Sequence, residues 1–427
     1  MNYTQNYKIN QVEEETLVVG VDIAKKTHYA RAFDWRGLEV SKVKKFNSDK
    51  EGFEEFSSWV KEVSKKAEKT KVIVGIEPTG HYWFTFGAYV INKGMQIVQV
   101  NPSHVKKAKE LDDNNPSKTD KKDPKTIAML VKDGRYLIPY YPKDKYAELR
   151  TGYEMRETHQ KNITRIKNRI TRWLDIYFPE FRKVFKTWNG KTAIMTLEKH
   201  ALPIEIIEMS AEEILNEWRE EIKRGNVGIS RAEELLKAAK DSVGIIEGLE
   251  MAKHEIKGLI KEYEFFNKQI EETEHRIKEI AITINGIDEI VSIKGIGIIT
   301  AAGFMAEVGD IKRFNHAKQI IKLAGLNIKE NSSGKHKGRT KITKRGRKRL
   351  RSLLYKAMLP LVGKNEEFKK LHNYYTTREK NPLKKKQSMI ALCVKLIRVI
   401  FAIITKNKKY DPVKLLEDIK RPELKIA

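Results

Sequence analysis

Cysteine is almost absent from this chain of 427 residues, in which Cys393 is the only one. A single thiol excludes an internal disulfide bond and a zinc site built from several cysteines. The chain is long enough for two or three domains whose hydrophobic cores need no covalent cross-link. We therefore expect a protein of a reducing compartment, the cytoplasm.

Long apolar runs are also scarce. The first fifteen residues are polar and partly acidic, without the apolar core of a secretory signal, so we expect no export. The longest apolar run, residues 388–405, is interrupted by Lys395 and Arg398 and is short for a membrane span. We expect it to form a buried helix whose two bases reach the surface, and we expect no membrane partner.

Acidic residues are few relative to basic ones: 57 against 84, which gives a formal net charge of +27. Such a charge attracts polyanions and would oppose a compact state in their absence. Nucleic acid is the expected partner. The alternative is a basic surface that only keeps the protein in solution.

The N-terminal region alternates short β-rich runs with amphipathic segments, which predicts the order β-β-β-α-β-α-β. The expected strands are 17–24, 28–34, 38–46, 71–78 and 96–102, and the expected helices are 49–69 and 81–94. This order, with a first strand apolar enough to be central, favours an α/β fold of the RNase H-like type. A doubly wound α/β domain is the alternative.

The rest of the chain is predicted to be mostly helical. Residues 144–178 contain no proline and predict one long helix, and Ser210 followed by Glu213 is a capping box. Apolar residues recur every seven positions over 249–284, which predicts a coiled coil with 144–178 or with another protomer. The alternative is a helix within a globular bundle. We expect domains at 1–142, 143–286 and 287–410, with a loosely packed tail at 411–427.

Four carboxylates in the N-terminal region stand out. Asp22 and Glu77 each follow an apolar strand that contains a glycine, and Asp120 and Asp123 are three residues apart at the start of an expected helix. If the two strands are neighbours, their carboxylates converge, and the i, i+3 spacing can aim the other pair at the same point.

Carboxylate oxygens without cysteine or histidine suit a hard cation, so this set predicts Mg²⁺ or Mn²⁺, as a two-metal pair for phosphodiester cleavage. Each carboxylate also has an ordinary structural explanation. Asp123 before Pro124 matches a helix N-cap followed by proline, and Asp22 and Glu77 could end strands or form turns.

The C-terminal region contains two features that suit phosphate binding. Residues 292–304, SIKGIGIITAAGF, have the form of a helix-hairpin-helix in which Gly295 and Gly297 leave backbone N–H groups for a phosphate; a plain helical hairpin is the alternative. Residues 335–351 hold ten lysines or arginines and no acid. The bases that we expect to bind nucleic acid are Lys335, Lys337, Arg339, Lys341, Lys344, Arg345, Arg347, Lys348 and Arg349.

Residues 331–338, NSSGKHKG, place two serines at the mouth of this basic run. From the residues alone, the serines could tighten a turn, hold a phosphate or attack one.

Taken in order, these segments resemble the IS110/IS1111 family of insertion-sequence transposases. GVDIAKKTHYA, GIEPTGHYW and SKTDKKDPKTIA resemble its N-terminal DEDD domain, which is similar to RuvC-type Holliday-junction resolvases. Residues 293–314 and 323–358 resemble its C-terminal transposase domain. Pro124 and Ile328 depart from the family pattern, which more often has a small helix former and a proline at these positions.

The resemblance implies a RuvC-like domain with a metal-binding tetrad at Asp22, Glu77, Asp120 and Asp123. It assigns the catalytic serine to Ser333 rather than Ser332. In the family this serine is thought to link covalently to DNA beside the tetrad of another protomer, and a noncoding bridge RNA pairs with donor and target.

The resemblance therefore implies several partners. These are element-end and target DNA, a bridge RNA and further copies of the chain in a dimer or tetramer, acting at the nucleoid of a bacterium or archaeon. Two other functions remain open. The first is a resolvase-type nuclease that uses the tetrad and water, and the second is a nucleic-acid scaffold without catalysis.

Overall fold

The computed structural model describes residues 5–112, 122–221, 228–329, 332–333, 336–338 and 340–420. The chain divides into two compact units, Met1–Tyr141 and Pro142–Ala427. The finer division that we predict, with boundaries after residues 142, 286 and 410, stays a prediction.

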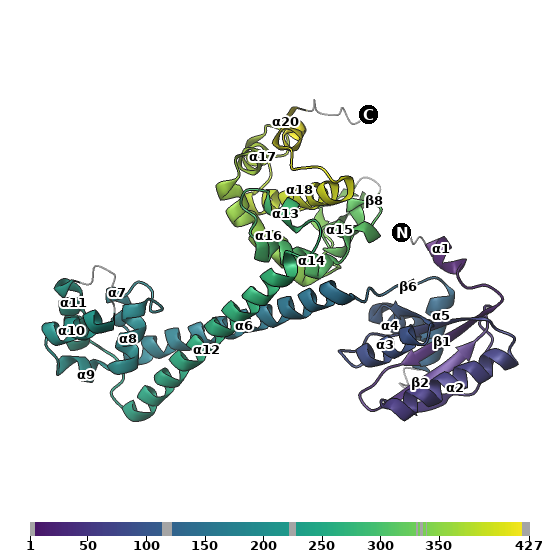
Figure 1. Ribbon diagram of the computed structural model, residues 1–427, viewed down its shortest axis with the longest axis horizontal. Coiled ribbons are helices and arrows are strands. Elements are labelled where there is room, and N and C mark those ends of the chain that lie inside the picture. Colours follow the sequence, from purple (N-terminus) through teal and green to yellow (C-terminus); the bar gives the residue numbers. More distant parts are fainter. Residues whose placement is uncertain are drawn as a thin grey trace. The chain divides into compact units, whose positions relative to one another are not determined.

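A six-stranded mixed sheet forms the centre of the first unit (Figure 1). Its strand order is β3-β2-β1-β4-β5-β6, with β1, β4 and β5 parallel and the other three strands antiparallel to their neighbours. The strands are β1 (Thr16–Asp22), β2 (Thr27–Phe33), β3 (Lys44–Asn47), β4 (Lys71–Ile76), β5 (Gln96–Val100) and β6 (Tyr136–Leu137).

The predicted β-β-β-α-β-α-β order is confirmed, and the topology is consistent with an RNase H-like arrangement. The short link between β1 and β2 allows only antiparallel pairing, because parallel strands need a long crossover. β3 is shorter than expected, since residues 38–43 pair with β2 only through a bridge between Phe33 and Glu39. A short edge strand rich in lysine discourages pairing with other chains.

Helices cover both faces of this sheet. α2 (Lys50–Lys66) and α3 (Trp83–Asn92) share one set of buried side chains with the sheet, and α4 (Pro102–Asp112) and α5 (Asp123–Lys132) share another. β1 is central and buried except at its last residue, as its apolar sequence predicts. A short helix, α1 (Gln5–Ile9), precedes it.

A histidine lies within the core between the sheet and α2. His28 on β2 is fully buried, and its ring stacks or packs at an angle against Phe46, Phe53 and Phe86. Its Nδ1 accepts a hydrogen bond from the N–H of Ala24 at 3.2 Å. Burial lowers the pKa of His28 from 6.5 to about 4, so the ring is neutral near pH 7.

Two long helices dominate the second unit. α6 (Asp144–Tyr177), the predicted long helix, packs along α12 (Leu249–Ala281), and Figure 1 shows them side by side. Their polar contacts fix an antiparallel direction, because low-numbered residues of α6 meet high-numbered residues near the end of α12. These contacts are Lys145 Nζ to Thr283 O, Arg156 Nε to Glu274 Oε1 and Trp173 Nε1 to Ala252 O.

The predicted heptad positions of α12 lie on its inner side. Ile256, Leu259 and Ile277 are buried, as are the less apolar seam residues Tyr263 and Thr273. Each helix is about 50 Å long, at 1.5 Å per residue. We expected residues 249–284 to pair either with residues 144–178 or with another protomer. The structure contains the first of these pairings.

Five shorter helices pack at the end of this pair where α6 finishes and α12 begins. They are α7 (Phe181–Val184), α8 (Lys191–Lys199), α9 (Pro203–Ile207), α10 (Ala211–Glu221) and α11 (Ile229–Lys240). Their apolar faces join those of α6 and α12 in one core, which we call the tip core.

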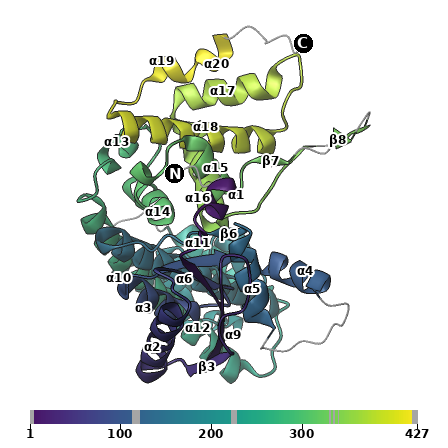
Figure 2. The ribbon, with the colours of Figure 1, turned by 90° about the vertical axis from the view of Figure 1, so that its right-hand side faces the viewer.

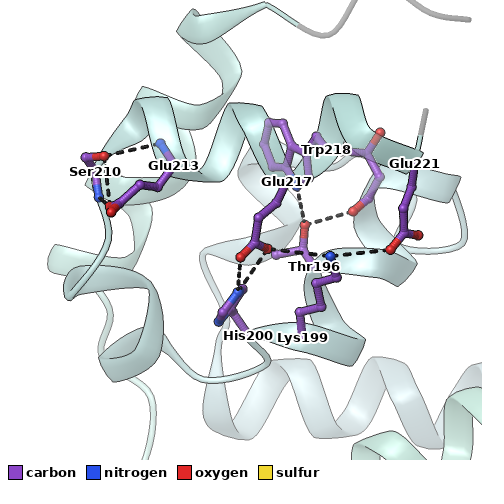
Figure 3. Close-up of polar contacts among 9 residues, drawn as sticks. Thr196, Lys199, His200, Ser210, Glu213, Glu217, Trp218 and Glu221 are labelled. Atoms are coloured by element: carbon purple, nitrogen blue, oxygen red, sulfur yellow. Dashed lines mark hydrogen bonds and ion pairs between the residues drawn. The ribbon is translucent and has the colours of Figure 1, made fainter. Parts of the chain in front are cut away.

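Polar contacts also organise the tip core (Figure 3). The predicted capping box is confirmed: Ser210 N–H donates to Glu213 Oε2 at 2.7 Å, and Glu213 N–H donates to Ser210 Oγ at 3.2 Å. Trp218 Nε1 donates to Thr196 Oγ1 at 3.0 Å, which joins α10 to α8. The bond from Trp218 satisfies polar groups that the packing removes from water, whereas the capping box is exposed.

The other end of the helix pair joins a second helical core, which we call the C-terminal core. Its helices are α13 (Ile287–Val291), α14 (Ile298–Val308), η1 (Ile311–Arg313), α15 (Ala317–Leu323), α16 (Lys348–Lys364), α17 (Glu366–Thr377) and α18 (Lys385–Lys406). Two short helices, α19 (Pro412–Leu415) and α20 (Glu417–Lys420), form where we expected a loose tail, because Leu415 is buried in this core.

The long apolar run forms α18, as predicted. Within the described residues, α18 is the one helix long and apolar enough to cross a membrane by length and composition. It belongs to the C-terminal core, where Leu392, Leu396 and Ile400 are almost completely buried. Its apolar sequence is therefore explained by packing within the protein.

His28 predicts a specific pH dependence of stability. The unfolded chain takes up a proton on this residue below pH 6.5, whereas the folded chain does so only near pH 4. This contribution to stability is complete above pH 6.5 and is lost as the pH falls to about 4, by up to about 3 kcal/mol.

The substitution His28→Asn keeps an acceptor for Ala24 N–H but does not titrate. Urea denaturation of both proteins from neutral pH to about pH 4 is expected to show a shallower loss of unfolding free energy in the variant. Equal slopes would show that folding does not lower the pKa of His28.

Candidate functional site

Two predicted carboxylates end neighbouring parallel strands. The register of β1 on β4 pairs Val21 with Ile76, so the next residues, Asp22 and Glu77, stand at the same level. Neighbouring strands lie about 4.8 Å apart, and residues paired in register point to the same face. The two side chains are half-buried at the carboxyl edge of the sheet. The strands are neighbours, as the predicted convergence requires.

A third carboxylate belongs to a helix that packs closely on this face. Gly20 and Gly75 precede Asp22 and Glu77 by two residues and share their face. A Cβ atom on Gly20 would lie 1.9 Å from Pro124 O, and one on Gly75 would lie 2.5 Å from Val131 Cγ2. α5 therefore rests directly on the two glycines.

Asp123 begins α5 and is 8% exposed. Its carboxylate forms an ion pair with Lys109 of α4. The helix N-cap is Lys122, so Asp123 does not act as the ordinary cap that its position before Pro124 also suggested. A buried carboxylate needs a compensating partner, and Lys109 provides it.

The set is not a closed metal site in the part of the chain that the structure describes. Among those residues, no three His, Cys, Asp or Glu side chains are gathered closely enough to hold a metal ion. Asp120 lies outside the described residues. The described donors are three carboxylates, which suit Mg²⁺ or Mn²⁺ by their chemistry.

The serine loop contains two short antiparallel ladders. At its base, β7 (Ile328–Lys329) pairs with β10 (Lys341–Ile342). Further out, β8 (Ser332–Ser333) pairs with β9 (His336–Lys337), with Ser333 opposite His336. Figure 2 shows β8 away from the helices of the C-terminal core. We call residues 328–342 the serine hairpin.

The basic run divides into two groups by its contacts. Lys341, Lys344, Arg345 and Lys348 are exposed. The backbone of Lys337 lies in β9, while Lys335 and Arg339 lie outside the described residues.

Two other arginines of the predicted nucleic-acid set contact the protein itself. Arg347 donates to the carbonyl of Glu307 at 2.6 Å, and Arg349 forms an ion pair with Glu154 on α6. Their contacts differ from those of the exposed bases, although all of these residues belong to one segment rich in lysine and arginine.

The two glycines before α14 have different surroundings. Gly295 adopts φ +104°, and a Cβ atom there would lie 3.1 Å from Leu361 Cα, so both the turn and the packing on α16 require glycine. Gly297 is the N-cap of α14, and no atom lies within 4 Å of where its Cβ would stand. The start of α14 is thus accessible beside Gly297, as anion binding requires.

Comparison with protein families separates the chain into two matched regions. Residues 19–179 match a family model described as a transposase of the DEDD, IS110 type, and residues 287–373 match one described as a transposase of the IS116/IS110/IS902 family. The two models occur in this order and together match more than half of the chain. The chain belongs to the IS110 family of insertion-sequence transposases.

Individual relatives agree with this membership. The chain is 22% identical over 400 residues to an insertion element IS116 protein of 44.8 kDa from Streptomyces clavuligerus, covering 92% of this chain and 96% of the relative. It is 24% identical over 403 residues to a pilin gene-inverting protein from Moraxella bovis, covering 92% and 97%. Over 146 residues it is 30% identical to the IS1111A transposase from Coxiella burnetii, covering 34% and 40%.

Membership in the IS110 family indicates which reaction these residues belong to. The chain is a transposase with a DEDD nuclease domain, which implies a divalent metal and binding to DNA. The matched DEDD region contains Asp22, Glu77 and Asp123. The role of each residue is a proposal, which we develop below.

Sequence analysis missed three residues of this site. Lys109 could not be recognised, because it lies in a lysine-rich helix and only the fold brings it to Asp123. Gly20 and Gly75 had a visible signal, since a glycine stands two residues before each strand-end carboxylate. Because glycine allows another backbone to approach closely, this repeat predicts a helix packed on the two glycines, on the face that carries the two carboxylates.

The packing of α5 is testable by adding one methyl group. We expect Gly20→Ala to lower the free energy of unfolding by about 1–3 kcal/mol, because the new Cβ overlaps Pro124 O. Displacement of α5 also moves Asp123, so metal-dependent DNA cleavage is expected to be lost.

The matched control is Gly258→Ala in α12, where no atom lies within 4 Å of the new Cβ. It is expected to raise the free energy of unfolding by about 0.5–1 kcal/mol and to leave cleavage unchanged. A Gly20→Ala protein with full stability and cleavage would contradict the close contact of α5 with β1. Urea denaturation and a DNA-nicking assay provide both measurements.

Proposed function

We propose that this transposase cuts and rejoins DNA through Ser333, with Asp22, Glu77, Asp120 and Asp123 holding Mg²⁺ or Mn²⁺. The observation that carries the proposal is the shared level of Asp22 and Glu77 on paired strands, with Asp123 on the helix that covers the same face. Both serines lie in the region that matches the second family model, and the choice of Ser333 over Ser332 rests on the resemblance of the NSSGKHKG segment to the family.

The carboxylates and the serine have different tasks in this proposal. The four carboxylates bind and orient a divalent cation, which supplies positive charge to the phosphate oxygens when bound. When no cation is bound, Lys109 compensates the charge of Asp123. The exposed bases Lys341, Lys344 and Arg345 hold the DNA backbone beside the hairpin by phosphate contacts that carry no sequence information.

The covalent step conserves the phosphodiester energy. Ser333 Oγ attacks the phosphorus and forms a serine–phosphate ester, while one P–O bond of the DNA backbone breaks. The proton that leaves the serine is gained by the departing DNA oxygen. Rejoining reverses the step, because a DNA hydroxyl attacks the ester and releases Ser333.

The finer architecture follows from the same function. We infer that the first unit is RuvC-like, that α6 and α12 act as a coiled coil, and that α13 and α14 form a helix-hairpin-helix around Gly295 and Gly297. The tetrad lies in the first unit and Ser333 in the second, so a second protomer can bring them to one phosphate. We therefore propose a dimer or tetramer that acts in the cytoplasm, at the nucleoid.

A guide RNA completes the proposal. No arrangement of the basic run suggests readout of base edges, so its positive charge gives affinity without sequence choice. We propose that a noncoding bridge RNA pairs with donor and target DNA and makes this choice.

The nucleophile is tested by trapping protein linked to DNA. With Mg²⁺, copurified RNA and DNA carrying the element ends and target, Ser333→Ala is expected to abolish the covalent product and Ser332→Ala to keep it. The physical reason is that alanine has no oxygen to form the ester. Denaturing gels with labelled DNA measure the product.

Other outcomes separate the competing functions. If Ser332→Ala alone removes the product, the nucleophile is one residue earlier. Cleavage of four-way junctions by Ser333→Ala would instead indicate a resolvase-type nuclease that uses water. If Asp22→Asn changes neither metal dependence nor products, the tetrad has no catalytic role and the protein is a scaffold.

The guide is tested by sequencing the RNA that copurifies with the protein. We expect one RNA, transcribed from DNA beside this gene, with two segments complementary to the element ends and the target. Recovery of only abundant cellular RNA, in proportion to its abundance, would contradict a guide and indicate non-specific binding by the positive surface.

A further inference from the structure

The base of the serine hairpin is held by backbone contacts on both of its strands. Beyond the pairing of β7 with β10, three N–H groups of the following segment donate back to the segment that precedes the hairpin. These are Thr343 to Asn327 O at 2.7 Å, Lys344 to Gly325 O at 3.0 Å and Arg347 to Leu323 O at 2.7 Å.

Two glycines permit this close approach. Gly325 has φ +67°, and its added Cβ would lie 2.9 Å from the carbonyl carbon of Lys344. Gly346 has φ +153°, and its added Cβ would lie 2.4 Å from Leu323 O. The backbones before and after the hairpin are thus in direct contact, so the direction in which the hairpin leaves the core is set here.

The C-terminus of α14 lies beside this base and is capped by arginines. The last carbonyls of a helix have no partner within the helix, and cations are favourable there. Three different elements supply the donors. They are Arg150 of α6 to Ala306 O at 3.0 Å, Arg347 to Glu307 O at 2.6 Å and Arg313 of η1 to Val308 O at 3.0 Å.

Glu307 distinguishes Arg347 from the other two arginines. Its side chain is almost completely buried, with 6% exposed, and its Oε2 lies 3.6 Å from Arg347 Nη1. Arg347 thus contacts both the carbonyl and the carboxylate of one residue. A buried carboxylate without a cation is unfavourable, so Glu307 favours arginine at this position and holds it in place.

The surroundings of Glu307 are closely packed. Tyr153 of α6 fits against Gly303 one turn earlier in α14, where an added Cβ would lie 2.5 Å from the ring. Burial is the main cause that raises the pKa of the Tyr153 hydroxyl, and the negative charge of the nearby Glu157 raises it further. The end of α14 therefore contacts α6 and the segment that follows the serine hairpin.

We propose that Glu307 and Arg347 are positioning residues for the serine hairpin, and that Arg347 does not contact DNA phosphates. Glu307 holds Arg347, whose backbone N–H holds Leu323 O, and together these contacts fix the base from which Ser333 is presented. The proposal rests on the proposed role of Ser333 but is measurable without it.

The test uses Glu307→Gln, which keeps the size of the side chain and removes its charge. We expect hydrogen exchange at the amides of Lys344 and Arg347 to accelerate, because the base opens more often. At saturating DNA, formation of the covalent product should slow by about 10- to 100-fold. The midpoint and salt dependence of DNA binding should stay unchanged.

Arg347→Gln should reproduce this pattern, and the double variant should be no worse than either single variant, because the two residues act as a unit. Arg347→Lys keeps the charge and should recover part of the rate. The control is Lys348→Gln, at an exposed neighbouring residue. This variant should make the negative slope of log affinity against log salt less steep by about 0.9, and it should leave hydrogen exchange unchanged.

Two results would overturn the proposal. One is unchanged exchange and rate in Glu307→Gln. The other is an Arg347→Gln protein with a lower salt slope and unchanged exchange, which would make Arg347 a phosphate contact. If Ser333→Ala still forms the covalent product, the proposed nucleophile is wrong, while the exchange measurements still decide whether Glu307 and Arg347 hold the hairpin.

Discussion

The contact between α5 and the two strand glycines is the constraint on which the N-terminal site depends. Without side chains at Gly20 and Gly75, the helix rests on the sheet backbone, and its first residue lies over the face that carries the strand-end carboxylates. A larger residue at either glycine separates the helix from the sheet. The position of Asp123 thus follows from the absence of two side chains.

Much of this arrangement was predictable because it follows from local patterns. Apolar runs predicted the strands of the first unit, a long segment without proline predicted α6, and Ser210 with Glu213 predicted a helix start. To predict that the carboxylates of Asp22 and Glu77 lie close together, it was enough to assume that their two strands are neighbours. These features depend on periodicity, turn length and capping, which are written in consecutive residues.

Contacts between distant segments were not predictable in the same way. Lys109 meets Asp123, and Arg347 meets Glu307, because helices that are far apart in sequence pack together. In the sequence, Arg347 is one of ten bases in a run without acidic residues, and no local pattern shows that its contacts differ from those of Lys344 or Lys348. Charge composition predicts the kind of partner for a surface, whereas the fold decides which charges remain on that surface.

The antiparallel pairing of α6 and α12 has a consequence for how this chain can change. The helices α7 to α11 are inserted in the chain between α6 and α12, and Ile245 N–H donates to Ile176 O at 2.9 Å, so the chain leaves and returns at adjacent points. An insertion with adjacent ends can grow, shrink or be exchanged while the opposite ends of the helices keep their spacing. Any replacement must keep apolar side chains that fit those of α6 and α12, because the inserted helices share one core with them.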